Sequence, residues 1–311
     1  MDYLKTTSDQ AHHGFDVMVV GEALMDVVTT GTLRAEHPGG SPANVAYGLA
    51  RLGVNTCLLT AIAPDAWGRR MEEHLVGAGV VILPGSHSLA RTASATATVA
   101  ADGSAHYDFD ISWELAPQTP AHFPKILHTG SIATFLEPGA GVVKSLLEQA
   151  HRQCVITYDP NIRPALLGSH SQALATFEEL VGLTDVVKLS EEDAQWLYPG
   201  RSTAGTAAHI LRLGTRLSVI TKGAEGSYLS TPGFEVIIPA SRAKVSDTIG
   251  AGDSYMSGLI HGLLNRHAEG FAPEILAQTG RAAAAAAAIT VQRPGANPPS
   301  LDELNAMLAS A

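Results

Sequence analysis

The chain has 311 residues, of which 45% are hydrophobic and 5% aromatic, and its 20 basic and 30 acidic side chains give a net charge of −10. This composition supports a large core and excludes disordered, collagen-like and mini-protein classes. The negative charge argues against nucleic acid or an anionic membrane surface as the main partner. The length fits two domains or one large α/β layer, so we expect a folded protein that binds any small anion in a local pocket.

The cysteines and the N-terminal residues predict a cytoplasmic protein. Cys57 and Cys154 lie in apolar runs far apart in the sequence, which favours buried, reduced thiols over a disulfide framework or a zinc site. Residues 1–14 read as a polar leader, and no window reaches the roughly 18 apolar residues that a membrane-spanning helix needs. The folded region is expected to be 15–311.

From residue 15 onward, short β-rich runs alternate with longer helical runs. The first predicted elements are a strand at 15–20, a helix at 42–52, a strand at 56–62 and a helix at 66–78. The series resumes with strands at 126–129, 155–158, 186–189 and 217–221, separated by helices at 139–151, 171–180, 191–197 and 203–213. Such alternation predicts an α/β fold with a doubly wound, mostly parallel sheet flanked by helices.

A pair of β segments interrupts this alternation. TASATATVA and AHYDFDI flank an Asp102-Gly103 turn, which is typical of a hairpin. Together with a short strand near 31–36 it would make a small β-sheet lid, with segments near 31–37 and 91–112. Because two-stranded pieces are marginal alone, this lid needs support from the core, a ligand or a partner subunit, and we expect a homodimer.

Towards the C-terminus, two β runs at 226–229 and 234–238 flank a Ser-Thr-Pro-Gly turn, and a helix begins near Ala251. The seven alanines at 282–288 predict a tightly packed helix, since alanine has the highest helix propensity and permits close approach.

The most informative segment is DTIGAGD at 247–253, which leads into an amphipathic helix. Free backbone amides and the positive end of the helix dipole favour an anion there, and Gly250 and Gly252 let a phosphate approach the backbone. Asp253 would stand beside that phosphate. Ordinary helix capping by Asp253 explains the same local pattern.

A second glycine-rich turn precedes a helix in the segment GGSPAN at 39–44. Asn44 offers donors and an acceptor for hydroxyl groups, although the segment could also be a plain βα turn. Asp26 follows the first predicted strand, where open α/β sheets place ligand-binding loops. A turn or capping role for Asp26 remains the alternative.

The pairing of GGSPANVAYGLARLG with DTIGAGD resembles the ribokinase-like sugar kinases, also called the phosphofructokinase B family, over nearly the whole chain. Within that family the chain is most similar to bacterial fructokinases, through GEALMD, PGGSPANVA, DPNIRP, VKLSEED and RPGA. The resemblance implies a ribokinase-like fold and transfer of the γ-phosphoryl group of ATP to a sugar hydroxyl, with Mg²⁺ as cofactor.

The resemblance also implies catalytic roles. Asp253 would be the base, and the amides of Gly250, Ala251 and Gly252 would form the anion hole. Phosphoryl transfer requires in-line positioning and charge stabilisation, which a carboxylate beside an amide turn can supply. The sequence has no Walker A pattern, so the glycine-rich turn would hold the phosphates instead.

By the same resemblance, five residues would bind the sugar substrate. They are Asp26, Gly39, Gly40, Asn44 and Arg163. Arginine is usually a solvated cation at the surface, and this is the alternative for Arg163.

The nucleotide side would comprise Lys188, Thr221, Gly223 and Gly226. Lys188 is expected just beyond a strand end, where a surface cation is again the alternative. The segment 221–226 could also be only a hairpin turn.

Metal sites are implied at two places. Asp193 stands where many relatives carry the Glu of Asn-x-x-Glu, so it could organise hydrated Mg²⁺, while capping by Ser190 explains the segment equally well. Asp247 and Ile249, with 293–295, correspond to the region that holds K⁺ in some relatives.

We therefore expect an ATP-dependent sugar kinase, with fructokinase as the first reading. A 2-keto-3-deoxygluconate kinase and a ribose or nucleoside kinase are alternatives that share the phosphate machinery. A catalytically silent sugar- or nucleotide-binding protein would not need Asp253 beside the phosphate turn, so we place it behind the enzymes.

Overall fold

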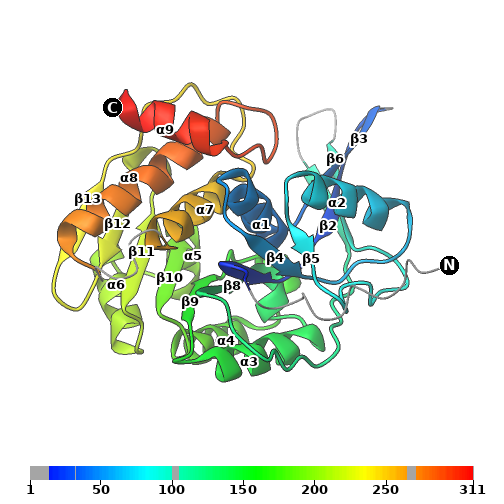
Figure 1. Ribbon diagram of the computed structural model, residues 1–311, viewed down its shortest axis with the longest axis horizontal. Helices are drawn as coiled ribbons and strands as arrows, with labels where there is room; N and C mark the ends of the chain where they lie inside the picture. The colour runs from blue at the N-terminus through cyan, green and yellow to red at the C-terminus, as the bar shows by residue number, and fades with distance from the viewer. Residues whose placement is uncertain (1–13, 32, 100–104, 265–270, 311) are drawn as a thin grey trace.

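The computed structural model describes residues 14–31, 33–99, 105–264 and 271–310, and shows a large layered body with a smaller sheet beside it (Figure 1). Residues 1–13 of the predicted leader and the predicted Asp102-Gly103 turn lie outside the described residues.

The large sheet has nine strands in the order β13-β12-β11-β10-β9-β8-β1-β4-β5. The pairs from β11 to β5 are parallel, and only β12 and β13 join antiparallel. This confirms the predicted doubly wound fold. The strands are β1 (Val17–Val20), β4 (Thr56–Leu59), β5 (Val81–Ile82), β8 (Ile126–Gly130), β9 (Val155–Asp159), β10 (Val186–Ser190), β11 (Leu217–Thr221), β12 (Ser227–Ser230) and β13 (Glu235–Ile238).

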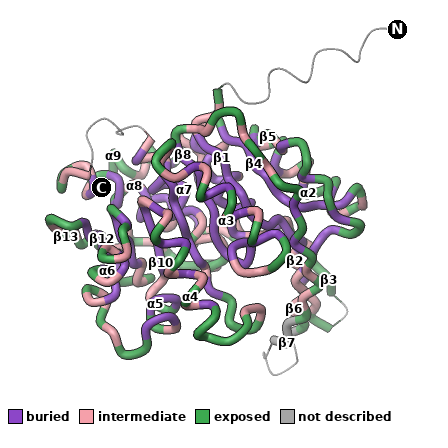
Figure 2. The backbone as a smooth tube through the Cα atoms, turned by 90° about the horizontal axis from the view of Figure 1, so that it is seen from below, coloured by how far each residue is buried: buried purple, intermediate pink, exposed green. Residues whose placement is uncertain are grey.

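Two helical layers cover the sheet because successive strand residues point to opposite faces. Val17 and Val19 belong to one core and Met18 and Val20 to the other. Figure 2 shows the buried residues concentrated on these central strands. The first core packs under α1 (Ser41–Arg51), α2 (Ala66–Gly77), α7 (Ala251–Leu264) and α8 (Pro273–Thr290), and the second under α3 (Gly139–Ala150), α4 (His170–Val181), α5 (Glu191–Leu197) and α6 (Thr203–Arg212).

The packing of α7 depends on small residues. A Cβ added at Gly258 would lie 2.8 Å from Cα of Ala283 in α8, and one at Gly48 of α1 would lie 2.4 Å from Oγ of Ser257. The alanine-rich segment is therefore a tightly packed helix, as expected. Its close contact with α7 fixes the helix that begins beside the DTIGAGD turn.

The strand order reverses between β1 and β8, because β4 and β5 lie on one side of β1 while the chain returns to β8 on the other. Open α/β sheets bind ligands beyond the carboxyl ends of the strands at such a point. The segment after β1 and the short helix η1 (Ser131–Thr134) after β8 meet there.

The smaller sheet, which we call the lid, has the order β3-β2-β6-β7. Its strand β3 projects from the body, and most of its residues are exposed (Figure 2). The sequence interpretation missed β2, and Asp26 lies inside that strand, not in a loop after β1. The strands are β2 (Leu24–Thr30), β3 (Leu33–Gly39), β6 (Ser94–Val99) and β7 (Ala105–Asp110).

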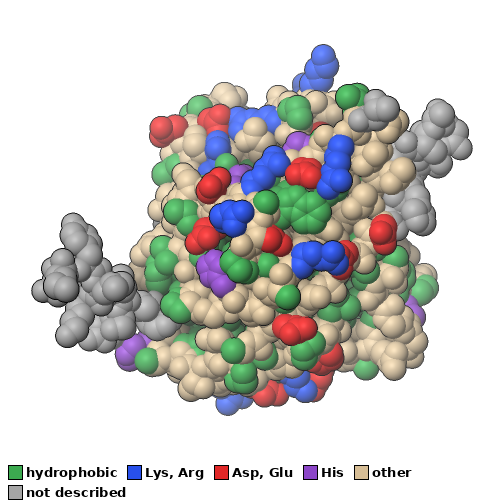
Figure 3. Space-filling view, turned by 90° about the vertical axis from the view of Figure 1, so that its right-hand side faces the viewer, with side chains coloured by type: hydrophobic (Ala, Val, Ile, Leu, Met, Phe, Trp, Pro, Cys, Tyr) green, Lys and Arg blue, Asp and Glu red, His purple; other side chains and the backbone are tan. Residues whose placement is uncertain are grey.

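Contacts with α2 hold the lid. Glu36 of β3 accepts a hydrogen bond from Nε1 of Trp67 at 3.1 Å, and its carbonyl oxygen accepts one from Arg70 at 2.8 Å. On this side of the molecule basic and acidic side chains are interspersed, so neither sign of charge dominates the face (Figure 3).

The remaining differences are small. The sequence interpretation missed β5 and α9 (Leu301–Ala309), and it did not identify Cys154 as only partly buried. Among the residues that the structure describes, no helix combines the length and apolar character needed to cross a membrane.

Candidate active site

Asp253 lies in the first turn of α7 and is held by two donors from α1. Oγ of Ser41 lies 2.7 Å from Oδ1 of Asp253, and Nδ2 of Asn44 lies 2.8 Å from Oδ2. Both oxygens of the carboxylate are therefore oriented by side chains more than 200 positions away in sequence. The two predicted motifs meet at this carboxylate.

The start of α1 requires glycine at two positions. Gly40 has φ 98°, and a Cβ there would lie 2.5 Å from the carbonyl oxygen of Glu22. A Cβ at Gly39 would lie 2.0 Å from Oδ2 of Asp26. The GG pair thus lets Asp26 lie against the backbone and directs the chain into α1.

The DTIGAGD segment forms a turn at the N-terminus of α7. Gly250 has φ 74°, and a Cβ there would lie 2.6 Å from Cβ of Ala296. The amide of Ala251 donates to the carbonyl of Thr248 at 3.2 Å, and within the described part of the chain the amides of Gly250 and Gly252 have no partner. Two of the three amides predicted for the anion hole are thus free, while that of Ala251 is engaged within the turn.

Lys188 lies inside β10, within the predicted strand at 186–189 and not beyond a strand end, and it is only 4% exposed. Its Nζ lies 2.6 Å from Oδ2 of Asp159 and 3.4 Å from the carbonyl oxygen of Gly252. Burial alone would lower the pKa of Lys188, but the Asp159 carboxylate more than offsets it, so the pKa lies above its ordinary value. A buried cation therefore lies directly beneath the glycine turn, and the surface interpretation of Lys188 is wrong.

Three further titratable groups lie in the region of Asp253. Burial, together with the nearby Asp253 carboxylate, raises the pKa of Glu22 to about 8 and that of Asp26 to about 6. Arg163 is close enough to Asp26 to lower its pKa. The exposed Arg163 guanidinium also donates to the carbonyl of Ile162 at 3.0 Å, so the fold brings Asp26, Arg163 and Asp253 to one region.

The predicted nucleotide residues lie at the carboxyl end of β11, on the same edge of the sheet. Thr221 pairs with Ser190 of β10 in register, and its hydroxyl donates to the carbonyl of Leu189 at 3.3 Å. Gly226 has φ 98°, and a Cβ there would lie 2.0 Å from the carbonyl of Ile238, whereas nothing lies within 4 Å of a Cβ at Gly223. Their described hydrogen bonds do not reach Asp253.

A model of the pfkB family carbohydrate kinases matches residues 15–303. The chain belongs to this family. A fructokinase from Rhizobium leguminosarum bv. trifolii is 32% identical over 259 residues, which cover 79% of each protein. Family and relatives together show an ATP-dependent sugar kinase.

Two solved structures agree with this assignment. The chain resembles a fructokinase with bound ATP from Xylella fastidiosa at a TM-score of 0.80 and 26% identity, over 94% of this chain and 98% of that one. It resembles a double mutant of fructokinase from Vibrio cholerae O395, in a fructose, ADP and potassium ion bound form, at the same TM-score and identity, over 94% and 97% of the chains.

The pfkB family implies ATP and a divalent metal ion, and Asp193 is the residue predicted to hold that metal through water. Its Oδ1 accepts from the amide of Ile162 at 2.9 Å and its Oδ2 from that of Ser190 at 3.0 Å, while the Ser190 hydroxyl caps α5. This geometry fits the capping alternative. Each carboxylate oxygen keeps a second lone pair for a water molecule, so the water-bridged metal role stays a prediction.

The predicted monovalent-cation region is a pair of joined loops. Oδ1 of Asp247 accepts from the amide of Ile249 at 3.0 Å, and Oδ2 accepts from that of Gly295 at 2.8 Å. These amides lower the pKa of Asp247. Asp247 therefore fixes the two loops relative to each other, and any cation would be bound by backbone oxygens.

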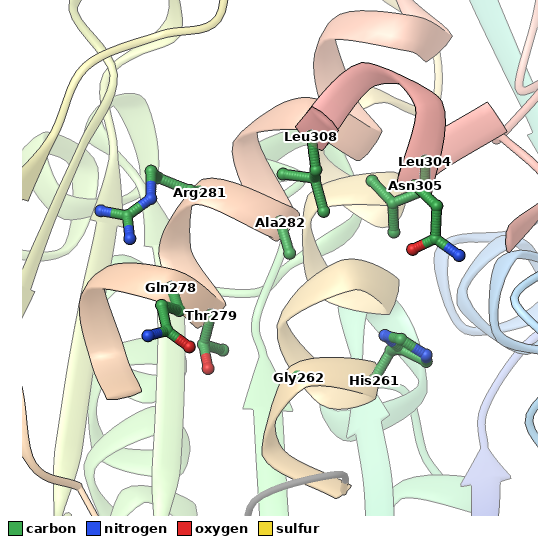
Figure 4. A pocket seen from close by; sticks show the side chains of 9 residues that line it. All are labelled: His261, Gly262, Gln278, Thr279, Arg281, Ala282, Leu304, Asn305 and Leu308. Atoms are coloured by element: carbon green, nitrogen blue, oxygen red, sulfur yellow. The ribbon is translucent and has the colours of Figure 1, made fainter. Parts of the chain in front are cut away.

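A separate cavity of about 410 Å³ lies between α7, α8 and α9 (Figure 4). His261 lines it about 12 Å along α7 from Asp253. Arg281 points away from the other side chains in Figure 4, and the lining residues that the structure describes include no carboxylate. This cavity is distinct from the site at Asp253.

Sequence reasoning missed three site residues, namely Ser41, Asp159 and Glu22. Ser41 is the residue between the glycine pair and Pro42, which marks it as a first-turn side chain. Asp159 directly follows the predicted strand at 155–158, and Glu22 follows the predicted strand at 15–20 after one glycine. Both positions place a side chain at the carboxyl edge of the sheet.

Replacing Lys188 should strongly destabilise this kinase. Lys188→Met leaves the Asp159 carboxylate buried without its cation, and we expect a loss of about 3–5 kcal/mol in the free energy of unfolding. Urea denaturation followed by circular dichroism measures it. The double variant Lys188→Met, Asp159→Asn removes both charges and should recover most of the loss; equal destabilisation of both variants would contradict the ion-pair explanation.

Proposed function

We propose that this sugar kinase is a fructokinase that transfers the γ-phosphoryl group of ATP to a hydroxyl of fructose. The observation that carries the proposal is the Asp253 carboxylate, oriented by Ser41 and Asn44 beside a turn with free amides. The fructokinase relatives, which are 32% and 26% identical to this chain, support the choice of fructose.

In the proposed reaction the sugar hydroxyl oxygen attacks the γ-phosphorus, its proton passes to Asp253, and ADP leaves. The two bonds from Ser41 and Asn44 hold the carboxylate in one orientation, which lowers the entropic cost of aligning the hydroxyl. The amides of the Gly250–Gly252 turn would receive phosphate oxygens, and the Lys188 charge beneath that turn would favour the same anion.

Asp26, Gly39, Gly40, Asn44 and Arg163 are proposed to bind the sugar. Asp26 lies on the lid strand β2, and the positive charge of Arg163 is close enough to lower the pKa of its carboxyl group. Asn44 already donates to Asp253, so its remaining amide hydrogen and carbonyl oxygen are the groups that a sugar hydroxyl could reach.

Lys188, Thr221, Gly223 and Gly226 are proposed to border the nucleotide, with Lys188 acting from below the turn. Mg²⁺ is the proposed divalent ion and would neutralise phosphate charge, with Asp193 acting through water. K⁺ is proposed at the loops that Asp247 joins, near Ile249, and the potassium-bound fructokinase relative supports it.

A homodimer and a cytoplasmic location remain part of the proposal. Leu33 of the lid strand β3 is 75% exposed, and a partner subunit covering β3 would bury it. The two free cysteines fit a reducing compartment.

A coupled ADP-release assay tests the proposed substrate. Fructose, ribose, 2-keto-3-deoxygluconate, tagatose and nucleosides would be compared, each with and without K⁺. Fructose should give the highest kcat/KM, with higher turnover in K⁺. A higher value for another sugar would replace fructose, and turnover of none of them would reject the sugar kinase.

Substituting Asp253 should separate chemistry from binding. Asp253→Asn keeps the size of the side chain but removes the proton acceptor, so kcat should fall by about 10²–10⁴-fold while ATP still binds. Steady-state kinetics and calorimetry measure the two quantities. The matched variant Ser41→Ala removes one orienting bond and should lower kcat less; near-normal kcat in Asp253→Asn would reject the assignment.

Asp26 should affect the binding of the sugar and not that of ATP. Asp26→Ala should lower kcat/KM for fructose by about tenfold or more, because charge-assisted bonds to hydroxyls are lost. The pKa of Asp26 is raised to about 6, so its ionised form appears as pH rises through that value, and wild-type kcat/KM should rise there. A flat wild-type profile, or a parallel loss of ATP affinity in the variant, would contradict this role.

A further inference from the structure

Glu22 is a buried carboxyl group at the point where the strand order reverses. It follows β1, its side chain is 4% exposed, and Oε2 accepts a hydrogen bond from the amide of Ala133 in η1 at 3.1 Å. The hydroxyl of Ser131 also bonds to the carboxyl group. Glu22 therefore joins the segments after β1 and β8 across the crevice of the sheet.

The short helix η1 connects the two sides of the site. A Cβ at Gly21 would lie 3.5 Å from Cβ of Ala133 and 2.3 Å from Cγ of Pro42, so η1, the segment after β1 and the start of α1 are in contact. On its other side Ile132 packs with Leu24 and Ala93 at the base of the lid. A shift of η1 would therefore displace both the start of α1 and the base of the lid.

The charges around Glu22 are unfavourable for its ionised form. Burial, with a smaller contribution from Asp253 on α7, raises its pKa to about 8. The salt bridges of the described residues include none to Glu22, and the nearby Asp26 on β2 is itself acidic. Near neutral pH the group is therefore protonated, so it adds no negative charge beside Asp253 and an incoming phosphate.

We propose that Glu22 is a positioning residue for sugar binding that fixes η1 against the start of α1 and the base of the lid. It does not touch the substrate, and it acts through Ala133 and Ile132. The inference rests on the proposed sugar kinase activity for its kinetic consequence, but the contact with η1 can be tested without any sugar.

Two substitutions separate the hydrogen bond from the charge. Glu22→Gln keeps an oxygen for the Ala133 amide and cannot ionise, so fructose KM at pH 7 should stay within about twofold of wild type. Glu22→Ala leaves that buried amide without a partner, so fructose KM should rise about tenfold or more, with the KM for ATP within about twofold. A purely structural role would lower the amount of active protein and leave both KM values unchanged.

The pH profile gives a second readout. As pH rises through about 8, wild-type Glu22 ionises beside Asp253, and kcat/KM for fructose should fall. The same fall should be absent or smaller in Glu22→Gln. Between the ordinary pKa of 4.5 and about 8, Glu22 keeps its proton in the folded state and loses it in the unfolded state. The free energy of unfolding of the wild type should therefore fall over this pH range, relative to that of Glu22→Gln.

Hydrogen–deuterium exchange of peptide 131–136 tests the contact itself. Exchange should be faster in Glu22→Ala and unchanged in Glu22→Gln. Asp185→Ala is the matched control, because Asp185 accepts from the amide of Ile156 at 2.9 Å at the amino end of β9, away from the site. This control should lower stability without changing fructose KM.

Unchanged exchange in Glu22→Ala would overturn the proposal even if no sugar is phosphorylated, whereas an inactive wild type would reject only the proposed function. Faster exchange with an unchanged fructose KM would also overturn it, since η1 would then not position the sugar site.

Discussion

Acidic groups crowd the carboxyl edge of the large sheet, and the site is organised around the cost of placing them there. Asp253 lies close enough to Asp26, Asp159 and Glu22 to raise the pKa of each of them. Desolvated charges of one sign repel strongly at low dielectric, so the fold must neutralise or orient each of them. Lys188 compensates Asp159, Arg163 faces Asp26, and protonation removes the charge of Glu22. Asp253 is left as the carboxylate that two side-chain donors orient.

Backbone segments also approach one another closely at this edge of the sheet. Gly39, Gly40 and Gly250 each stand where a Cβ would overlap a neighbouring atom. These glycines allow the lid strand, the start of α1 and the DTIGAGD turn to converge on Asp253. The chemistry of the site therefore depends on steric access as much as on charge, because a phosphate can reach the backbone amides only where side chains are absent.

The lid is coupled to this edge through short contacts. Glu36 links β3 to α2, while Ile132 of η1 packs with Leu24 and Ala93 at the lid base. Asp26 lies on the lid strand β2, so a sugar that bonds to Asp26 would contact the lid and the body together. In this kinase, substrate recognition and lid position are thus expected to be linked. The raised pKa values of Asp26 and Glu22 make that link sensitive to pH.

The sequence by itself determined the α/β alternation, the two glycine-rich turns and the resemblance to ribokinase-like kinases, because periodicity and short motifs are local properties of the chain. It identified Asp253 and Asn44 but not their direct bond. It left open whether Lys188 borders the nucleotide or is a surface cation, and it placed Asp26 in a loop. It also passed over Ser41, Asp159 and Glu22. Only the tertiary structure decided these points, since burial and ion pairing depend on segments up to some 200 positions apart that meet at one sheet edge. Local sequence carries no signal for which distant partner a buried charge will find.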